Sequence, residues 1–221
     1  METIKTYFKR KQSTKQALFW VTLFVFCFCN FLVWNSYFCF DFFFASDIAQ
    51  KTHTSVGELE SLFRHLLFYL QGWQSTLPLA PFSASLAAKQ HFAEVRFWFI
   101  LNNSVGLLLS LPAYWSLFRL KYQWYWIKQW ISSLQKGFFL LFGLMILAFG
   151  PLFTVFHLLL FPNQKWLFHL PEDSIIYLLP ESLFQFYFCY WGMLLLIISI
   201  ALKIYIKRKE NYSDRSKRSA R

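Results

Sequence analysis

Residues 17–40 of this chain read ALFWVTLFVFCFCNFLVWNSYFCF, an apolar run without a charged side chain. A run of about 20 apolar residues is long enough to cross the hydrocarbon core of a bilayer as a helix. It exceeds the apolar core of a signal peptide and lacks a small-x-small cleavage site, so we expect it to remain as an anchor. Basic residues precede it and favour a cytoplasmic N-terminus: Lys5, Lys9, Arg10, Lys11 and Lys15.

The composition of the whole chain points to a membrane location. Of 221 residues, 57% are hydrophobic, 23% are aromatic and only 15% are charged, which excludes a disordered chain and a soluble domain. The net charge of +11 comes mainly from basic residues that flank the apolar runs. We therefore expect contact with membrane lipid and no nucleic-acid partner.

Three further apolar runs follow, at residues 95–118, 137–160 and 184–202, and a basic tail, residues 203–221, ends the sequence. Basic side chains collect at one end of each run. Since basic residues concentrate in cytoplasmic loops, this pattern predicts that both termini are cytoplasmic. The predicted fold class is an all-α integral membrane protein, with four transmembrane helices in a single membrane domain, residues 1–221.

The connections between the runs predict an extracellular cap. Two outer segments, residues 41–94 and 161–183, are long enough to form it. The inner loop, residues 119–136, is expected to contain an interfacial helix. Its basic residues are interspersed with Trp124, Trp126 and Trp130.

The first outer segment contains signals for two helices. Ser55 and Glu58 fit a capping box, and the apolar residues after them recur at helical spacing up to a stop near Gly72. Ser83 or Ser85 is the expected N-cap of a second helix, which leads into the second apolar run.

Familiar catalytic and metal-binding signatures are absent from the sequence, among them G-x-S-x-G, H-E-x-x-H, C-x-x-C and the Walker loop. The cysteines lie in apolar runs, where a thiol behaves as a small hydrophobic group. Only Cys39 and Cys189 are near the predicted outer face. We therefore expect no metal and no cofactor.

Two histidines lie near the predicted outer boundary of the membrane. A straight helix that starts at Gly137 and rises about 1.5 Å per residue brings His157 to this boundary, about 30 Å along. His91 lies about one turn before the second run, at the same depth. Ionisable groups at membrane depth are candidates for function. An imidazole that bonds a backbone carbonyl at an interface is the alternative.

Glu94 follows His91 by three residues and shares its helical face. A carboxylate in this position can orient the imidazole and raise its basicity. A surface ion pair between Glu94 and either Arg96 or Lys89 is the alternative, and the spacing allows both.

Two segments of the chain resemble the lipoprotein intramolecular transacylase family of four-span bacterial membrane proteins. They are residues 83–99, SASLAAKQHFAEVRFWF, and residues 156–184, FHLLLFPNQKWLFHLPEDSIIYLLPESLF. The resemblance extends over about residues 55–190. Carried over by motif, it implies that His91 and His157 are the catalytic histidines.

The resemblance also implies a set of supporting or substrate-binding residues: Glu94, Arg96, Trp166, Asp173 and Glu181. The chain departs from the family pattern in places. Glu94 stands where the family has Asp, while His169 and Leu170 stand where members commonly have Asp and Pro or another residue.

The activity implied by the resemblance moves the sn-2 acyl chain of a lipoprotein's diacylglyceryl-Cys onto its own α-amino group. His157 is the expected general base and His91 the acid or oxyanion partner, with the reverse assignment open. Phe161, Trp166 and Phe168 are expected to shape the pocket. An ordinary interfacial aromatic belt is the alternative.

The implied partner is the diacylglyceryl-modified N-terminus of a lipoprotein, and the implied location is the bacterial cell membrane, multi-pass, with the active site outside. A non-catalytic scaffold or receptor of the same fold is the alternative function. A transporter is disfavoured because strong polarity within the predicted spans is limited to a few asparagines. The sequence leaves the oligomeric state undetermined.

Overall fold

The computed structural model describes residues 35–117 and 146–219, together with Phe26, Asn30, Phe31, Val33, 135–137, Phe139, Leu140 and 142–144. The regular elements in these residues are all helices, which confirms the predicted all-α class. They are α2 (Ala45–Thr52), α3 (Val56–Leu70), α4 (Leu86–Leu117), α6 (Phe149–Leu160), the short 3₁₀ helix η1 (Ser174–Leu178) and α7 (Glu181–Ser219). The predicted basic N-terminus, most of the predicted first span and most of the predicted inner loop lie outside the described residues.

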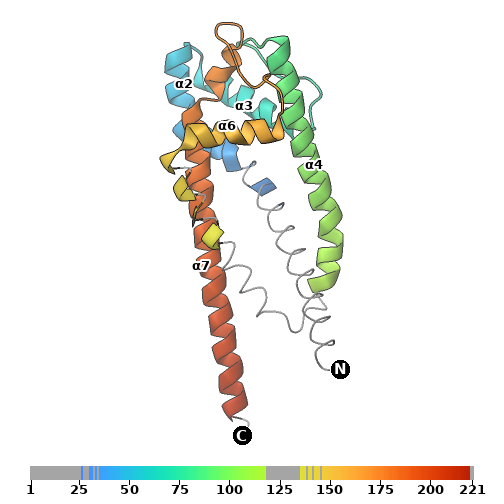
Figure 1. The fold of residues 1–221 in the computed structure, drawn as a ribbon, viewed down its shortest axis with the longest axis vertical. Coiled ribbons are helices and arrows are strands. Elements are labelled where there is room, and N and C mark those ends of the chain that lie inside the picture. Colours follow the sequence, from blue (N-terminus) through green and yellow to red (C-terminus); the bar gives the residue numbers. More distant parts are fainter. Residues whose placement is uncertain are drawn as a thin grey trace.

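Two long helices and a cluster of short ones make up the described fold. α4 and α7 extend in the same direction from one end of the molecule, where α2, α3 and η1 gather (Figure 1). α3 packs against α4 and α2, and α2 also contacts η1. α6 lies across the molecule between α4 and α7, next to the short helices (Figure 1). We call residues 41–94 and 161–183 the cap.

The hydrophobic core lies within the cap, in the residues just before it and at the adjoining end of α7. The ring of Phe40 stacks on the ring of Phe63 in α3, with the centroids 3.9 Å apart. Leu66 of α3, Ile175 of η1 and Leu183 of α7 are fully buried in the same cluster. Burial of such side chains stabilises by roughly 1.5–3 kcal/mol each, so this core holds the cap helices together.

The predicted helix starts in the cap are confirmed. Ser55 accepts a hydrogen bond from the backbone N–H of Glu58, whose carboxylate accepts from the Ser55 N–H, forming the capping box of α3. Such a cap is worth about 1 kcal/mol. Ser85 caps α4, because its hydroxyl oxygen accepts from the Ala88 N–H at 3.2 Å. α3 ends where predicted, since Gly72 adopts a positive φ of 85°, which glycine tolerates best.

The two cap segments are joined next to the start of α4. Asp173 accepts a hydrogen bond from the Ser85 N–H at 2.7 Å. The Ser83 hydroxyl donates to the Glu172 carbonyl at 2.8 Å, and the Ser83 carbonyl accepts from the Ile175 N–H. These bonds fix residues 161–183 against the end of α4 that carries His91.

The predicted third span is not one straight helix. Gln135–Leu144 and Phe149–Leu160 meet at 115°, so α6 turns sideways beneath the cap (Figure 1). Pro151 lies in the first turn of α6, where N–H groups have no partner within the helix and proline is tolerated. The prediction that His157 lies about 30 Å along a straight helix is therefore wrong.

Among the described residues, a helix that crosses a membrane has to meet a requirement of length and apolar composition. Ser174–Tyr205 meets the requirement, with a mean hydropathy of 1.9, and only 12% of its apolar window is buried. The bent pair Gln135–Leu144 and Phe149–Leu160 meets it when the two helices count as one span.

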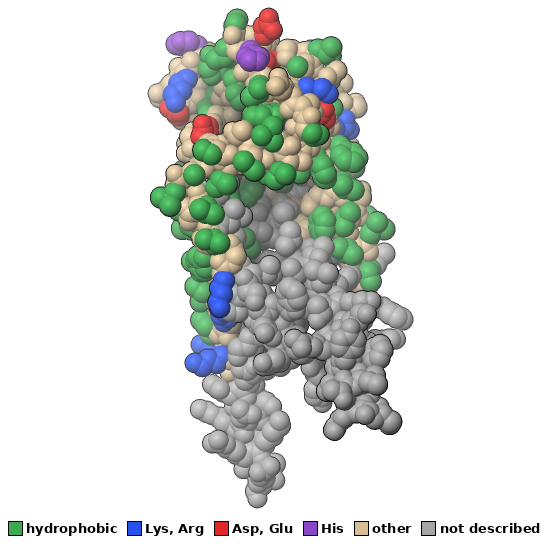
Figure 2. Space-filling model, viewed as in Figure 1, with side chains coloured by type: hydrophobic (Ala, Val, Ile, Leu, Met, Phe, Trp, Pro, Cys, Tyr) green, Lys and Arg blue, Asp and Glu red, His purple; other side chains and the backbone are tan. Residues whose placement is uncertain are grey.

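The surface is divided by polarity along the long axis. Acidic side chains and histidines gather at the cap end together with some Lys and Arg, hydrophobic side chains predominate on the described sides below it, and further Lys and Arg side chains lie at the lower end (Figure 2). Large apolar side chains on those sides are exposed, for example Leu107, Leu108, Leu147, Leu159 and Ile197. Exposed apolar area of this extent indicates contact with lipid or with another protein.

Candidate functional site

His91 of α4 and His157 of α6 lie together, although 66 residues separate them in the sequence. Their ring centroids are 5.9 Å apart. Both side chains are buried, with 6% of His91 and 9% of His157 exposed. Two imidazoles withdrawn from water and this close can contact one small reacting group at the same time.

Aromatic rings surround the pair. Phe161 lies 4.6 Å from His91, and Trp166 lies 5.0 Å from His157, measured between ring centroids. Phe168 lies 5.8 Å from His91, and Phe153, which the sequence analysis did not select, lies 4.1 Å from His157. The structure thus gathers all three predicted aromatic residues around the histidines.

The hydrogen bonds of the two imidazoles differ. Nδ1 of His157 lies 2.8 Å from the backbone carbonyl oxygen of Phe153. Because a carbonyl oxygen only accepts, Nδ1 carries the proton and Nε2 of the neutral ring has a free lone pair. Nδ1 of His91 is buried without a hydrogen-bond partner among the described residues. A buried polar atom of this kind is available to a ligand.

The surroundings of His91 keep its ring neutral. Burial, and then the nearby His157, lower the pKa of His91 to about 4, while the negative charge of Glu94 opposes this shift. At neutral pH the His91 ring is therefore uncharged, and its one N–H can donate a hydrogen bond.

Glu94 is bound by the second cap segment instead of Arg96 or Lys89. Its carboxylate accepts from Lys165 Nζ at 2.8 Å and from Asn163 Nδ2 at 3.1 and 3.3 Å. Although burial raises the pKa of Glu94, the hydrogen bonds from Lys165 and Asn163 bring it below the ordinary value. The one signal for this pair in the sequence is that Lys165 is the sole Lys or Arg in residues 161–183.

Three other residues proposed from the sequence have contacts away from the imidazoles. The Arg96 guanidinium lies 4.8 Å from the centre of the Tyr69 ring and donates to the Ser75 carbonyl. Asp173 joins the cap segments as described above. Glu181 is exposed in the first turn of α7, where it accepts from Gln185. Arg96 thus contacts the first cap segment and Asp173 joins the two cap segments, while the supporting or substrate-binding role of all three residues stays a prediction.

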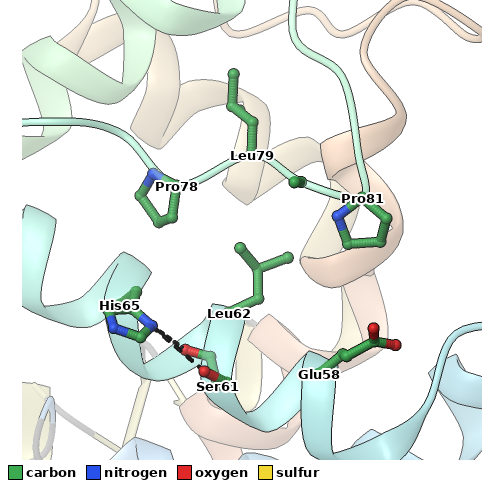
Figure 3. A pocket seen from close by; sticks show the side chains of 8 residues that line it. Glu58, Ser61, Leu62, His65, Pro78, Leu79 and Pro81 are labelled. Atoms are coloured by element: carbon green, nitrogen blue, oxygen red, sulfur yellow. Dashed lines mark hydrogen bonds between the residues drawn. The ribbon is translucent and has the colours of Figure 1, made fainter.

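A separate pocket of about 460 Å³ lies on the cap (Figure 3). Neither His91 nor His157 is among the residues that line it. It opens between α3 and the loop that contains Pro78 and Pro81. His65 on its wall bonds the Ser61 carbonyl at 2.8 Å, so this imidazole is fixed by its own helix. The lining combines polar residues of α3 with an apolar loop.

Within the described parts of the chain, no cluster of three His, Cys, Asp or Glu side chains is arranged to hold a metal ion. Cys39 and Cys189 are both free thiols.

The chain has the fold of a class of membrane-integral helical proteins, as a family profile and solved structures show. The profile of the lipoprotein intramolecular transacylase (Lit) family matches residues 15–187, and the chain belongs to this family. No protein with a curated description matches the sequence.

Solved structures share the fold. An in meso structure of the membrane-integral lipoprotein intramolecular transacylase Lit from Bacillus cereus is 23% identical, with a TM-score of 0.64 over 91% of this chain and 94% of that one. A variant of the same protein with a histidine changed to arginine is 20% identical, with a TM-score of 0.63 over 96% of this chain and 100% of that one. A second variant, with histidine changed to alanine, is 21% identical, with a TM-score of 0.60 over 94% of this chain and 99% of that one.

Proposed function

We propose that this protein is a lipoprotein intramolecular transacylase. It moves the sn-2 acyl chain of a diacylglyceryl-modified N-terminal Cys to the α-amino group of the same residue, which produces the lyso form. The observation that carries this proposal is the pair of buried imidazoles 5.9 Å apart inside an aromatic enclosure. Membership of the transacylase family supports the same reaction class.

The first step is attack by the substrate amine. An α-amino group has a pKa of about 7.7–8.0, so at neutral pH it first loses a proton to solvent and reacts as the free amine. As the amine nitrogen forms a bond to the sn-2 carbonyl carbon, Nε2 of His157 removes a proton from that nitrogen, because its lone pair is available while Nδ1 donates to Phe153. An oxyanion develops on the carbonyl oxygen.

The second step expels the glyceryl oxygen. An N–H of neutral His91 donates to the oxyanion, which lowers the barrier because the donor is fixed in a site away from water. The His157 imidazolium returns its proton to the departing glyceryl oxygen as the carbon–oxygen bond breaks. The histidines end in their starting protonation states, and the product has the same atoms as the substrate.

No nucleophilic side chain is needed, because the acyl donor and the acceptor belong to one molecule. The reaction is chiefly an orientation problem, and a rigid aromatic wall made by Phe161, Trp166 and Phe168 suits it. The same wall keeps water from hydrolysing the ester.

We propose a multi-pass topology with four spans, near residues 17–40, 95–118, 137–160 and 184–202, in one membrane domain of a bacterial cell. Both termini are cytoplasmic, and the histidine pair faces outside. The polar cap end and the apolar sides support placement in a membrane, and the basic residues that flank the apolar runs support this orientation. Single cysteines placed in a cysteine-free chain at Glu60, Lys128, Leu170 and Arg215 should react from outside, inside, outside and inside, respectively.

The function is tested in bacteria with and without this protein, by mass spectrometry of their lipoproteins. Cells that make the protein should gain lipoproteins with an N-acyl group and one remaining glyceryl ester. Unchanged diacylglyceryl lipoproteins, at equal protein level, would favour the alternative of a non-catalytic scaffold or receptor.

A further inference from the structure

Asn163 connects α4 to the second cap segment through several hydrogen bonds. Its side-chain NH₂ donates to both carboxylate oxygens of Glu94. Its side-chain oxygen accepts from the Lys165 backbone N–H at 3.0 Å. Its backbone carbonyl accepts from the indole N–H of Trp166 at 2.8 Å. One residue thus fixes the loop backbone, a helix carboxylate and an aromatic wall residue together.

The same turn is attached to α6 at its other end. The Phe161 N–H donates to the His157 carbonyl, and the Asn163 N–H donates to the Phe161 carbonyl, both at 2.7 Å. Trp166, held by Asn163, lies 5.0 Å from the His157 ring. The place of Trp166 relative to His157 is therefore set by the turn that Asn163 organises.

We propose that Asn163 is a positioning residue for transacylation, which acts by holding Trp166 against His157 and by anchoring this turn to Glu94. The inference rests on the proposed function. It changes the role of Glu94 from orienting His91 to anchoring the loop, together with Lys165.

The chemistry at this position requires an amide. Glu94 needs a donor, whereas the Lys165 N–H needs an acceptor, and the Asn side chain supplies both at the right length. Asp at position 163 would still accept from the Lys165 N–H, but its carboxylate would lie next to the carboxylate of Glu94 and repel it. Ala removes both contacts.

The test exchanges the carboxylate at position 94 and the amide at position 163 in the purified full-length protein. N163D sets two carboxylates against each other, and E94Q weakens the contact with Asn163 by replacing the carboxylate with an amide and removes the ion pair with Lys165. The E94Q N163D double variant again pairs an amide with a carboxylate, with the two groups exchanged. Q164E serves as the matched control, because it makes the same change at the neighbouring exposed side chain. The assay follows kcat and KM on a diacylglyceryl lipopeptide, together with thermal unfolding in detergent.

We expect each single variant to lose roughly 10- to 100-fold in kcat with KM nearly constant, since a displacement of about 1 Å costs this much. The double variant should recover most of the loss, and Q164E should be silent. Losses that multiply in the double variant, or a lower melting temperature with unchanged kcat, would overturn the inference and leave the function intact. If the wild-type protein forms no product, the function fails. In that case, recovery of the melting temperature in the double variant supports the anchoring contact between Asn163 and Glu94. A melting temperature that does not recover overturns this contact.

Discussion

Nδ1 of His157 donates a hydrogen bond to the backbone carbonyl of Phe153, four residues earlier in α6, at 2.8 Å. The bond fixes both the tautomer and the direction of the ring, so Nε2 is the nitrogen left for proton transfer. A bond to a backbone carbonyl is also what a purely structural histidine makes. The two roles therefore have to be separated by a substitution that keeps this bond.

His157→Asn is such a substitution, because its amide NH₂ can occupy the place of Nδ1 while no group replaces Nε2. We expect it to fold normally and to lose transacylation by roughly 10²- to 10⁴-fold, the usual contribution of general acid–base assistance. Initial rates on a diacylglyceryl lipopeptide, per folded molecule, measure the loss. Near-normal activity would show that His157 is not the base.

The lowered pKa of His91 predicts a pH-dependent stability. The unfolded chain binds a proton on this ring below its ordinary pKa of 6.5, whereas the folded protein does so only below about 4. Stability should therefore fall as the pH is lowered from about 6.5 to 4. Thermal unfolding of the wild type and of His91→Gln across this range checks the effect, since the variant should lose part of the slope. Identical slopes would contradict burial of a neutral His91.

Local patterns in the sequence predicted much of the cap. The capping box at Ser55 and Glu58 and the N-cap Ser85 rely on contacts within four residues, which spacing alone reveals. The proximity of His91 and His157 was also predicted. The physical argument for it assumed a straight helix, and the structure reaches the same proximity with α6 turned sideways.

Contacts between distant segments were the part that the sequence did not reveal. The sequence spacing suggested Arg96 and Lys89 as ion-pair partners of Glu94, because residues close together on one helix can be recognised from their spacing. Its actual partner, Lys165, comes from a loop whose path depends on Asn163 and on the break before α6. The loop path also brings Asp173 to the backbone N–H of Ser85, the N-cap residue of α4.

The hydrogen bonds of Asp173 predict that this residue contributes to the stability of the fold and takes no direct part in the reaction. Its carboxylate accepts from the N–H groups of Ser85 and His169 and is buried, and these bonds hold its pKa below 3.8 despite the burial that opposes this. Its contribution is present above pH 3.8 and is lost as the pH falls through the lowered pKa. Asp173→Asn should destabilise by about 1–3 kcal/mol at pH 7.

Thermal unfolding at pH 7 measures this change, with Glu181→Gln as the control at an exposed carboxylate. The control should unfold like the wild type. An Asp173→Asn protein with normal stability and strongly reduced kcat would instead assign Asp173 to the reaction.

The central claim is that the transferred acyl chain comes from the substrate's own glyceryl group. The most direct measurement gives purified protein a diacylglyceryl lipopeptide in detergent, together with isotope-labelled phospholipid, and analyses the product by tandem mass spectrometry. We predict a product of unchanged mass with a blocked N-terminus, one acyl chain on nitrogen and no label. Label on the amine would contradict the claim, because the chain would then have come from phospholipid.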